Sequence, residues 1–244
     1  MRQLKRYYET DRDRILSNCS ISGFMCQDGR RVAGDAVLTS ISVMHDRGNG
    51  LGGGIAAYGI YPEMADHYAL HLMYDDVVDH EATEHILSEQ FDVEEEERIP
   101  TRRHPNIVDP PLFWRYFVSP KPDLVAEYAR DGLTEDDFMV DAVMHINRTV
   151  PGAFVVSSGK NMGAFKGVGY PEDIGRFFKL EEYKAYTWTA HGRFPTNTPG
   201  WWGGAHPFTL LDTTVVHNGE ISSYGINMRY VEALGYACTM RTDT

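Results

Sequence analysis

Cysteine is scarce in this chain of 244 residues, which has only Cys19, Cys26 and Cys238. An odd and sparse set argues against a disulfide framework and favours a reducing compartment, and no pair has the CxxC spacing of a zinc site. Basic residues are in the minority, because 23 Lys and Arg face 35 Asp and Glu for a formal net charge of −12. Such a surface repels phosphates, which disfavours nucleic acids and anionic membranes as partners.

Long apolar segments are missing as well. Residues 1–18 are charged throughout and lack the apolar core of a signal peptide. No stretch approaches the apolar length that spans a bilayer. We therefore expect a cytoplasmic protein without a membrane segment. The one dense run of charge, the four glutamates at 94–97, predicts a solvated helix face or loop rather than a site.

Hydrophobic periodicity predicts an α+β arrangement rather than a strict alternation of strands and helices. A hairpin is expected where two apolar stretches, 153–158 and 164–169, flank Gly159-Lys160-Asn161. Segments 186–191, 209–211 and 213–216 are expected as strands of one packed sheet. Other strands are expected at 20–25, 55–60, 68–75, 112–118 and 236–240, and helices at 33–46, 81–91, 135–148, 171–183 and 222–234.

Two further patterns do not predict a cofactor site. The glycine-rich stretch 48–54 lacks the Lys-Ser/Thr of a phosphate-binding loop and precedes a strand instead of opening a helix. His67 and His71 have helical i,i+4 spacing, and His80 and His85 lie nearby. The local pattern there is strand-like and shows no carboxylate triad, so no metal site is predicted.

The stretch VVHNGEIS at 215–222 places Asn218-Gly219 after a β-branched run. By itself this dipeptide indicates a turn at a hairpin corner. A second interpretation depends on what else the chain contains.

Six short stretches, in this order along the chain, together resemble the class II glutamine amidotransferases. These enzymes are N-terminal-nucleophile hydrolases that release ammonia from glutamine. The likeness is greatest to the glutamate-synthase branch, which includes the stand-alone amidotransferase subunits of archaeal-type glutamate synthases and N-methylglutamate synthases. The stretches are CSISGFM from Cys19, MHDRGNGLGGGIAAYG at 44–59, HGRFPTNT at 191–198, AHPF at 205–208, VVHNGEIS at 215–222 and TDT at 242–244.

The resemblance implies a four-layer αββα sandwich, in which two mostly antiparallel sheets lie between helical layers. Its motifs cover about 16–60 and 186–244. Residues 1–18 are therefore expected to be a leader or propeptide, and 19–244 the amidotransferase domain with an insertion at about 61–185. The chain stops at Thr244 directly after an expected turn, which predicts a C-terminally truncated domain.

The resemblance also implies catalytic roles. Cys19 would be the nucleophile, and its own α-amine, with a pKa near 8, would be the general base once residues 1–18 are removed. The side-chain N–H of Asn218 and the backbone N–H of Gly219 would hold the oxyanion. Taken alone, a free cysteine is more often a small buried apolar residue.

Substrate recognition follows from the charges of glutamine. The resemblance places Arg193 on its α-carboxylate, where a guanidinium binds bidentately, with Thr196 as a further donor. Asp243 would receive the α-ammonium. His206 and His217 could bond substrate, although core histidines bonded to backbone are at least as common. Arg47 is expected to support the backbone around the nucleophile.

The expected activity is hydrolysis of L-glutamine through a Cys19 thioester, with ammonia passed to a partner synthase. That partner would hold any FMN, since this chain has no flavin or iron–sulfur ligand pattern and glutamine hydrolysis needs no cofactor. Two departures leave alternatives open. Ser20 stands where the family usually has glycine, and an uncleaved leader leaves no α-amine. The alternatives are a silent glutamine-sensing or scaffolding subunit, and an amidase acting on another amide.

Overall fold

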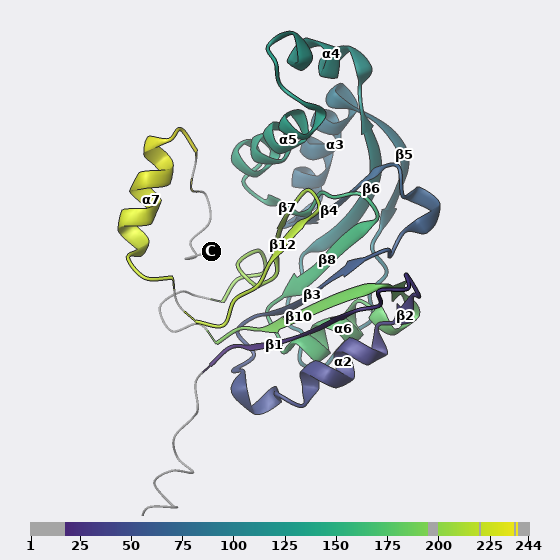
Figure 1. The fold of residues 1–244 in the computed structure, drawn as a ribbon, viewed down its shortest axis with the longest axis vertical. Coiled ribbons are helices and arrows are strands. Elements are labelled where there is room, and N and C mark those ends of the chain that lie inside the picture. The colour runs from purple at the N-terminus through teal and green to yellow at the C-terminus, as the bar shows by residue number, and fades with distance from the viewer. Residues whose placement is uncertain (1–17, 195–199, 220, 237, 239–244) are drawn as a thin grey trace, which may run out of the picture.

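The computed structural model describes residues 18–194, 200–219, 221–236 and 238. The chain is a mixed α/β protein with several sheets, of which two antiparallel four-stranded sheets carry most of the core (Figure 1). Neighbouring strands of the first sheet are, in spatial order, β1 (Ser20–Met25), β10 (Thr187–Gly192), β3 (Gly53–Tyr58) and β8 (Met162–Gly167). Those of the second sheet are β5 (Phe91–Arg98), β6 (Leu112–Pro120), β4 (Tyr68–Tyr74) and β7 (Ala153–Ser157).

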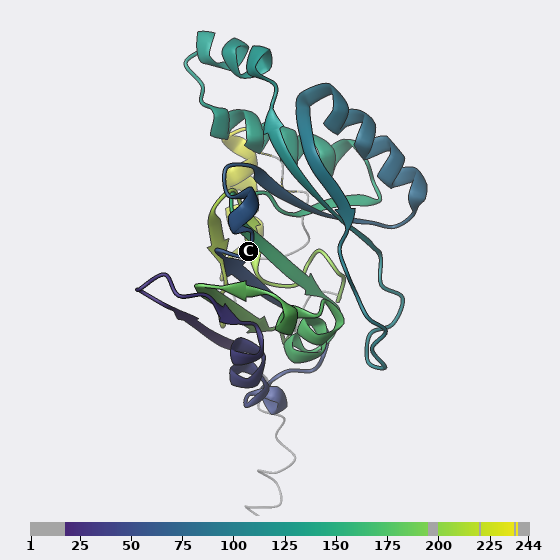
Figure 2. The same ribbon diagram turned by 90° about the vertical axis from the view of Figure 1, so that its right-hand side faces the viewer.

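Helices cover a face of each large sheet (Figures 1 and 2). The helices α2 (Asp35–Ser42) and α6 (Pro171–Phe177) pack on the first sheet, whereas α3 (Val77–Gln90) and α5 (Glu135–Thr149) pack on the second. This arrangement is compatible with an N-terminal-nucleophile hydrolase fold, and the face-to-face stacking of a four-layer sandwich stays a prediction. The smaller elements are α4 (Pro122–Arg130), α7 (Tyr224–Ala233), the paired strands β2 (Val32–Ala33) and β9 (Lys184–Ala185), the paired strands β11 (Phe208–Leu210) and β12 (Thr213–Val215), and 3₁₀ turns at His45–Arg47, Pro62–Met64 and Leu180–Glu182.

Helix α5 shows how local sequence sets an element. The Thr134 hydroxyl accepts from the backbone N–H of Asp137, and the Asp137 carboxylate accepts from the Thr134 backbone, which forms a capping box. These hydrogen bonds hold the pKa of Asp137 below its usual value. Apolar residues then recur every three or four positions and are buried, as an amphipathic helix requires. They are Phe138, Met139, Ala142, Val143 and Ile146.

The glutamate run at 94–97 is largely exposed to solvent as expected, but the expectation of a helix face or loop was wrong. These residues form part of β5, which within the described part of the chain has β6 as its single neighbour in the sheet. The strand is at the sheet edge and its acidic side chains face solvent, apart from the ion pair of Glu97 with Arg115. Charges on an edge strand hinder pairing with another chain, so the run is explained by its edge position.

The expected hairpin across Gly159-Lys160-Asn161 was also wrong. The two strands exist, but β7 pairs with β4 in the second sheet while β8 pairs with β3 in the first. The turn between them therefore crosses from one sheet to the other. A side chain at Gly159 would lie 2.4 Å from the carbonyl oxygen of Leu211, so the crossing also presses against the β11–β12 turn.

The expectation that 186–191, 209–211 and 213–216 share one sheet was wrong for β10, since among the described residues β11 and β12 pair only with each other. Both edges of β10 are already occupied, by β1 and β3. The β11–β12 hairpin is held by polar contacts instead. The Tyr58 hydroxyl donates to the carbonyl oxygen of Asp212 at 3.0 Å, and the Thr209 hydroxyl donates to that of Val156 at 2.7 Å.

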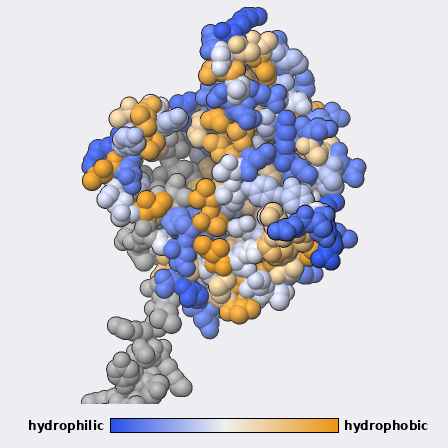
Figure 3. Space-filling view, in the orientation of Figure 1, coloured by the Kyte–Doolittle hydropathy of each residue, from blue (hydrophilic) through white to orange (hydrophobic). Residues whose placement is uncertain are grey.

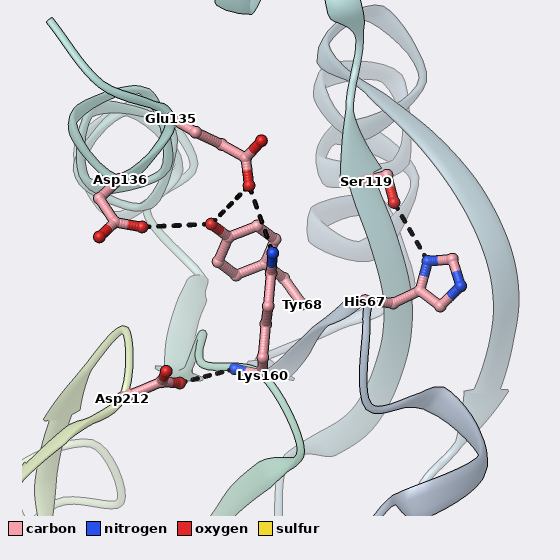
Figure 4. Close-up of polar contacts among 7 residues, drawn as sticks. All are labelled: His67, Tyr68, Ser119, Glu135, Asp136, Lys160 and Asp212. Atoms are coloured by element: carbon pink, nitrogen blue, oxygen red, sulfur yellow. Dashed lines mark hydrogen bonds and ion pairs between the residues drawn. The ribbon is translucent and has the colours of Figure 1, made fainter.

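A polar cluster anchors the tip of this hairpin to the second sheet (Figure 4). The backbone N–H of Lys160 donates to the Asp212 carboxylate at 2.8 Å. The Lys160 ammonium lies over the Tyr68 ring and 3.4 Å from Glu135, to which the Tyr68 hydroxyl also donates. Burial and the nearby carboxylates, Glu135 and Asp136, raise the pKa of Tyr68. These contacts thus fix the position of the β11–β12 hairpin, which directly precedes residues 216–219.

Helix α7 lies to one side of both sheets (Figure 1). Ile226, Tyr230 and Leu234, expected on one face, are 63%, 65% and 59% exposed. The space-filling view shows apolar side chains on this segment among polar ones (Figure 3). The expected strand at 236–240 falls mostly outside the described residues.

A buried hydrogen-bond chain joins the two large sheets. Arg115 donates to the Tyr61 hydroxyl at 2.9 Å, and the same hydroxyl oxygen lies 2.8 Å from His71 Nε2. His71 Nδ1 is 3.0 Å from the carbonyl oxygen of Ala164, which can only accept, so Nδ1 carries the proton and Nε2 accepts from Tyr61. Burial and the neighbouring Arg115 lower the pKa of His71 to about 3.

The stability of the protein is expected to fall below pH 6.5. Unfolded histidine binds a proton near pH 6.5, whereas folded His71 stays neutral down to about pH 3, so unfolding takes up a proton between these values. His71 alone then lowers the free energy of unfolding by about 2 kcal/mol between pH 6.5 and pH 5. Urea unfolding at both pH values measures this. His71→Gln should reduce the pH dependence, and the exposed His85→Gln should not; equal slopes in all three proteins would contradict the assignment.

Candidate active site

Cys19 lies directly before β1, at the end of the first sheet where β10 ends and β3 begins. Its side chain is partly buried, and the backbone N–H of Phe194 donates to Sγ at 3.4 Å. Arg47 Nε donates to the Cys19 carbonyl oxygen at 3.4 Å. Cys26 and Cys238 are free cysteines in other places, at the far end of β1 and after α7.

The register of the first sheet brings Arg193 to the same place. Ser20 pairs with Gly192, and Gly192 pairs with Gly53 on the other side. Arg193 follows immediately, its backbone N–H bonded to the Gly52 carbonyl oxygen at 2.8 Å and its side chain only 6% exposed. The candidate nucleophile and the candidate carboxylate-binding residue therefore lie next to the paired ends of two neighbouring strands of one sheet.

Ser20, which stands where the family pattern has glycine, has a buried side chain next to Gly192. Its side chain is 3% exposed, and a side chain at Gly192 would lie 2.4 Å from its hydroxyl oxygen. Successive side chains of a strand alternate between faces, so Ser20 points away from the face that carries Ile21 and its partner His191. The hydroxyl fills space that glycine at 192 leaves open.

Two glycines of the 48–54 stretch are required by close backbone approach. A side chain at Gly53 would lie 2.6 Å from the backbone nitrogen of Pro171, at the start of α6. A side chain at Gly54 would lie 2.4 Å from the carbonyl oxygen of His206, on the opposite face. The small residues here let chain segments rest directly on both faces of the sheet.

Three histidines cluster on the face opposite α2 and α6. The ring of His206 lies 4.3 Å from that of His191 and 4.8 Å from that of His217. Burial lowers the pKa of His191 to about 4 and that of His206 to about 2, with the neighbouring cationic groups contributing in the same direction. His206 is 3% exposed, so in this structure it is part of the buried support of the site.

Lys166 is buried beside these histidines. It pairs with Gly54 across the sheet, and Gly54 pairs with His191, so both long side chains flank the same glycine. Its ammonium donates to the carbonyl oxygen of Pro207 at 3.2 Å and lies 4.3 Å from the Phe208 ring centre. Burial lowers the pKa of Lys166 to about 7.

Asn218 and Gly219 follow β12 and are both exposed. Gly219 has φ = +149°, a conformation that residues with a side chain rarely adopt, and nothing lies within 4 Å of where its Cβ would be. Glycine is therefore favoured at position 219 by its backbone conformation and not by crowding from neighbouring atoms. His191 Nε2 lies 2.8 Å from the carbonyl oxygen of His217, which fixes the peptide that leads into this pair.

Two predicted substrate residues, Thr196 and Asp243, lie outside the described residues, as does the end of the HGRFPTNT motif. Within the described part of the chain, no group of three or more His, Cys, Asp or Glu is arranged to hold a metal ion. None of the described helices is both long and apolar enough to cross a bilayer.

The sequence reasoning assigned no role to His191 or Lys166. His191 begins the HGRF motif, and Lys166 is the one charged residue in the β8 sequence MGAFKG. A lysine within an otherwise apolar or small-residue strand was the available signal for a buried cation.

Comparison with known proteins adds independent evidence. Residues 134–242 match the family model described as glutamine amidotransferases class-II. A protein of Archaeoglobus fulgidus described as uncharacterized is 55% identical over 244 residues, covering 98% of this chain and 63% of its own length. The isomerizing glutamine–fructose-6-phosphate aminotransferases of Vibrio cholerae and Sulfurisphaera tokodaii are similar over shorter segments. They are 30% identical over 93 residues and 35% identical over 81 residues, covering 38% and 32% of this chain and 15% and 14% of their own lengths.

The chain thus spans less than two thirds of each of these relatives. The family match contains Arg193, the buried histidines and the Asn218–Gly219 turn, whereas Cys19 precedes it. On this match, residues 134–242 are similar to the class II glutamine amidotransferases.

Proposed function

We propose that this chain hydrolyses L-glutamine to glutamate and ammonia as the glutaminase part of a glutamate-synthase-like amidotransferase. One observation carries the proposal: Cys19 Sγ accepts from the backbone N–H of Phe194, 175 residues away in sequence. This contact supports the proposal, because it brings a candidate nucleophile next to the residue that follows the buried Arg193. A thiol beside a cation that can bind a carboxylate suits attack on an amino-acid amide.

The proposed reaction has two halves. The Cys19 α-amine, freed by removal of residues 1–18, accepts the thiol proton, and the sulfur attacks the side-chain amide carbon of glutamine. Asn218 and Gly219 donate to the oxyanion that forms. The C–N bond then breaks, and the leaving nitrogen takes the proton to depart as ammonia. Water attacks the γ-glutamyl thioester in the same way, which releases glutamate and restores the thiol.

Glutamine would be oriented by its charged head group. Arg193 is proposed to bind the α-carboxylate, with Thr196 as a second donor, and Asp243 to bind the α-ammonium. The sequence also predicts His206 as a substrate contact. Its burial and the contact of its ring with that of His191 support a role in holding the 205–217 segment in place.

The wider assignment includes a partner. We propose that ammonia passes to a synthase subunit or domain, with FMN-dependent chemistry confined to that partner, and that the assembly works in the cytoplasm. The two aminotransferase relatives carry glutamine in their names, which supports glutamine as the nitrogen donor. We also propose a leader at 1–18 and an insertion within 61–185, where the whole second sheet falls, although β8 and α6 from that range pack with the first sheet.

Intact mass of the protein expressed in cells tests this proposal, measured with and without a thiol-alkylating glutamine analogue. We expect loss of the mass of residues 1–18, one adduct on Cys19, and ammonia release from glutamine by the unlabelled protein. A full-length mass without adduct or hydrolysis would overturn it. If glutamine then still raised the melting temperature, the chain would be a glutamine-sensing subunit.

A further inference from the structure

A hydrogen bond ties the 217–219 segment to the central strand β10. His191 is fully buried, and its Nε2 lies 2.8 Å from the carbonyl oxygen of His217. A carbonyl oxygen only accepts, so His191 must carry its proton on Nε2. The bonded carbonyl belongs to the peptide whose nitrogen is that of Asn218, so this bond fixes the plane of the peptide entering the Asn218–Gly219 pair.

The His191 ring is itself held from the other side. The 206–208 segment rests on Gly54, because that position has no side chain to push it away. Lys166 holds the segment through the Pro207 carbonyl oxygen, and the His206 ring packs against that of His191 at 4.3 Å. The ring of His191 therefore has little freedom to turn.

These surroundings favour a fixed donor rather than an acid or base. Burial lowers the pKa of His191 to about 4, and the nearby His217 and Arg193 act in the same direction. Its Nδ1 has no hydrogen-bond partner among the described residues, so no proton path leads from that atom within them. At neutral pH the ring is uncharged and donates from Nε2.

We propose that His191 is a positioning residue that holds the Asn218–Gly219 donors at the place where the oxyanion of the reaction forms. This inference rests on the proposed function. An oxyanion-binding donor acts mainly on the transition state, so its misplacement lowers kcat more than it changes KM.

The test compares His191→Leu with His191→Gln, because glutamine can place an amide N–H near the former Nε2 and leucine cannot. We expect His191→Leu to lower kcat for glutamine hydrolysis about 10- to 100-fold with KM within about twofold, and His191→Gln to recover most of the loss. His80→Leu, a partly buried histidine on α3 near Trp114, is the matched control and should keep the wild-type kcat. Melting temperatures establish that the variants are folded.

Unchanged kcat in folded His191→Leu, or a His191→Gln protein as slow as the leucine variant, would overturn the inference. If the leucine variant does not fold, ¹⁵N NMR of wild-type histidines decides, with His191 assigned from the spectrum of His191→Gln. An Nε2-protonated neutral ring between pH 5.5 and pH 8 is expected, and an Nδ1-protonated ring would refute the inference. A wild-type protein without glutaminase activity would instead refute the proposed function.

Discussion

Cys19→Ser is expected to lower the rate of glutamine hydrolysis at least about 1000-fold while leaving the fold intact. Serine replaces sulfur with a hydroxyl of nearly the same shape, so the contacts with Phe194 and Arg47 have room to persist. What is lost is the thiolate, which forms at a much lower pH than an alkoxide and is the stronger nucleophile. Ammonia release and covalent labelling by a glutamine analogue measure the change.

Cys26→Ser is the matched control for this substitution. Cys26 follows β1 at its opposite end, where its backbone bonds to Tyr186, so the variant should keep wild-type activity and labelling. Residual activity of Cys19→Ser near that of the wild type would assign the nucleophile to another residue. Equal loss in both variants would indicate a general effect of thiol removal on folding.

Local sequence was sufficient where a single element's own residues decide its form. A short apolar stretch gave the strand at 20–25, and proline followed by acidic residues gave the helix that begins at Pro171. The helix expected over 33–46 ends at Ser42 and is followed by a separate 3₁₀ turn. Helix α4 was not predicted, although Pro122 at its first position and Asp123 in its first turn are helix-start signals.

Prediction from local sequence failed where the structure of a segment depends on the strand with which it pairs. The strands at 153–157 and 162–167 were found, but nothing in their residues tells that the turn between them changes sheets. The glutamates at 94–97 form an edge strand because Leu112–Pro120 offers them a neighbour. Strand pairing between segments so far apart in sequence depends on the whole fold, so a short stretch of sequence does not reveal it.

The site shows the same division. Cys19 and Arg193 were singled out as motif residues, and the register Ser20–Gly192 explains why motifs so far apart meet. The hydrogen bond between His191 and the His217 carbonyl oxygen could not be predicted from the sequence, because every residue has a backbone carbonyl acceptor. The importance of Gly54 likewise appears only when the His206 backbone is seen to lie against it.

Asn218→Ala is expected to lower kcat about 100- to 1000-fold, because it removes one of the two donors proposed for the oxyanion. Asn218 is exposed, so truncating its side chain removes little packing, and the melting temperature should stay close to that of the wild type. KM for glutamine should change little, since the ground-state amide oxygen needs this donor less than the oxyanion does. A rise in KM at constant kcat would instead place Asn218 among the groups that bind the substrate.

The double variant Asn218→Ala/His191→Leu separates direct from indirect action. If His191 works by placing the segment that carries Asn218, its own substitution has less left to disturb once the Asn218 amide is gone. The combined loss in kcat should then be smaller than the product of the two single losses, with Gly219 accounting for any remaining effect of His191. Multiplicative losses would mean that His191 and Asn218 act independently. That result would place the effect of His191 elsewhere in the buried cluster, although its ring reaches the backbone one residue before Asn218.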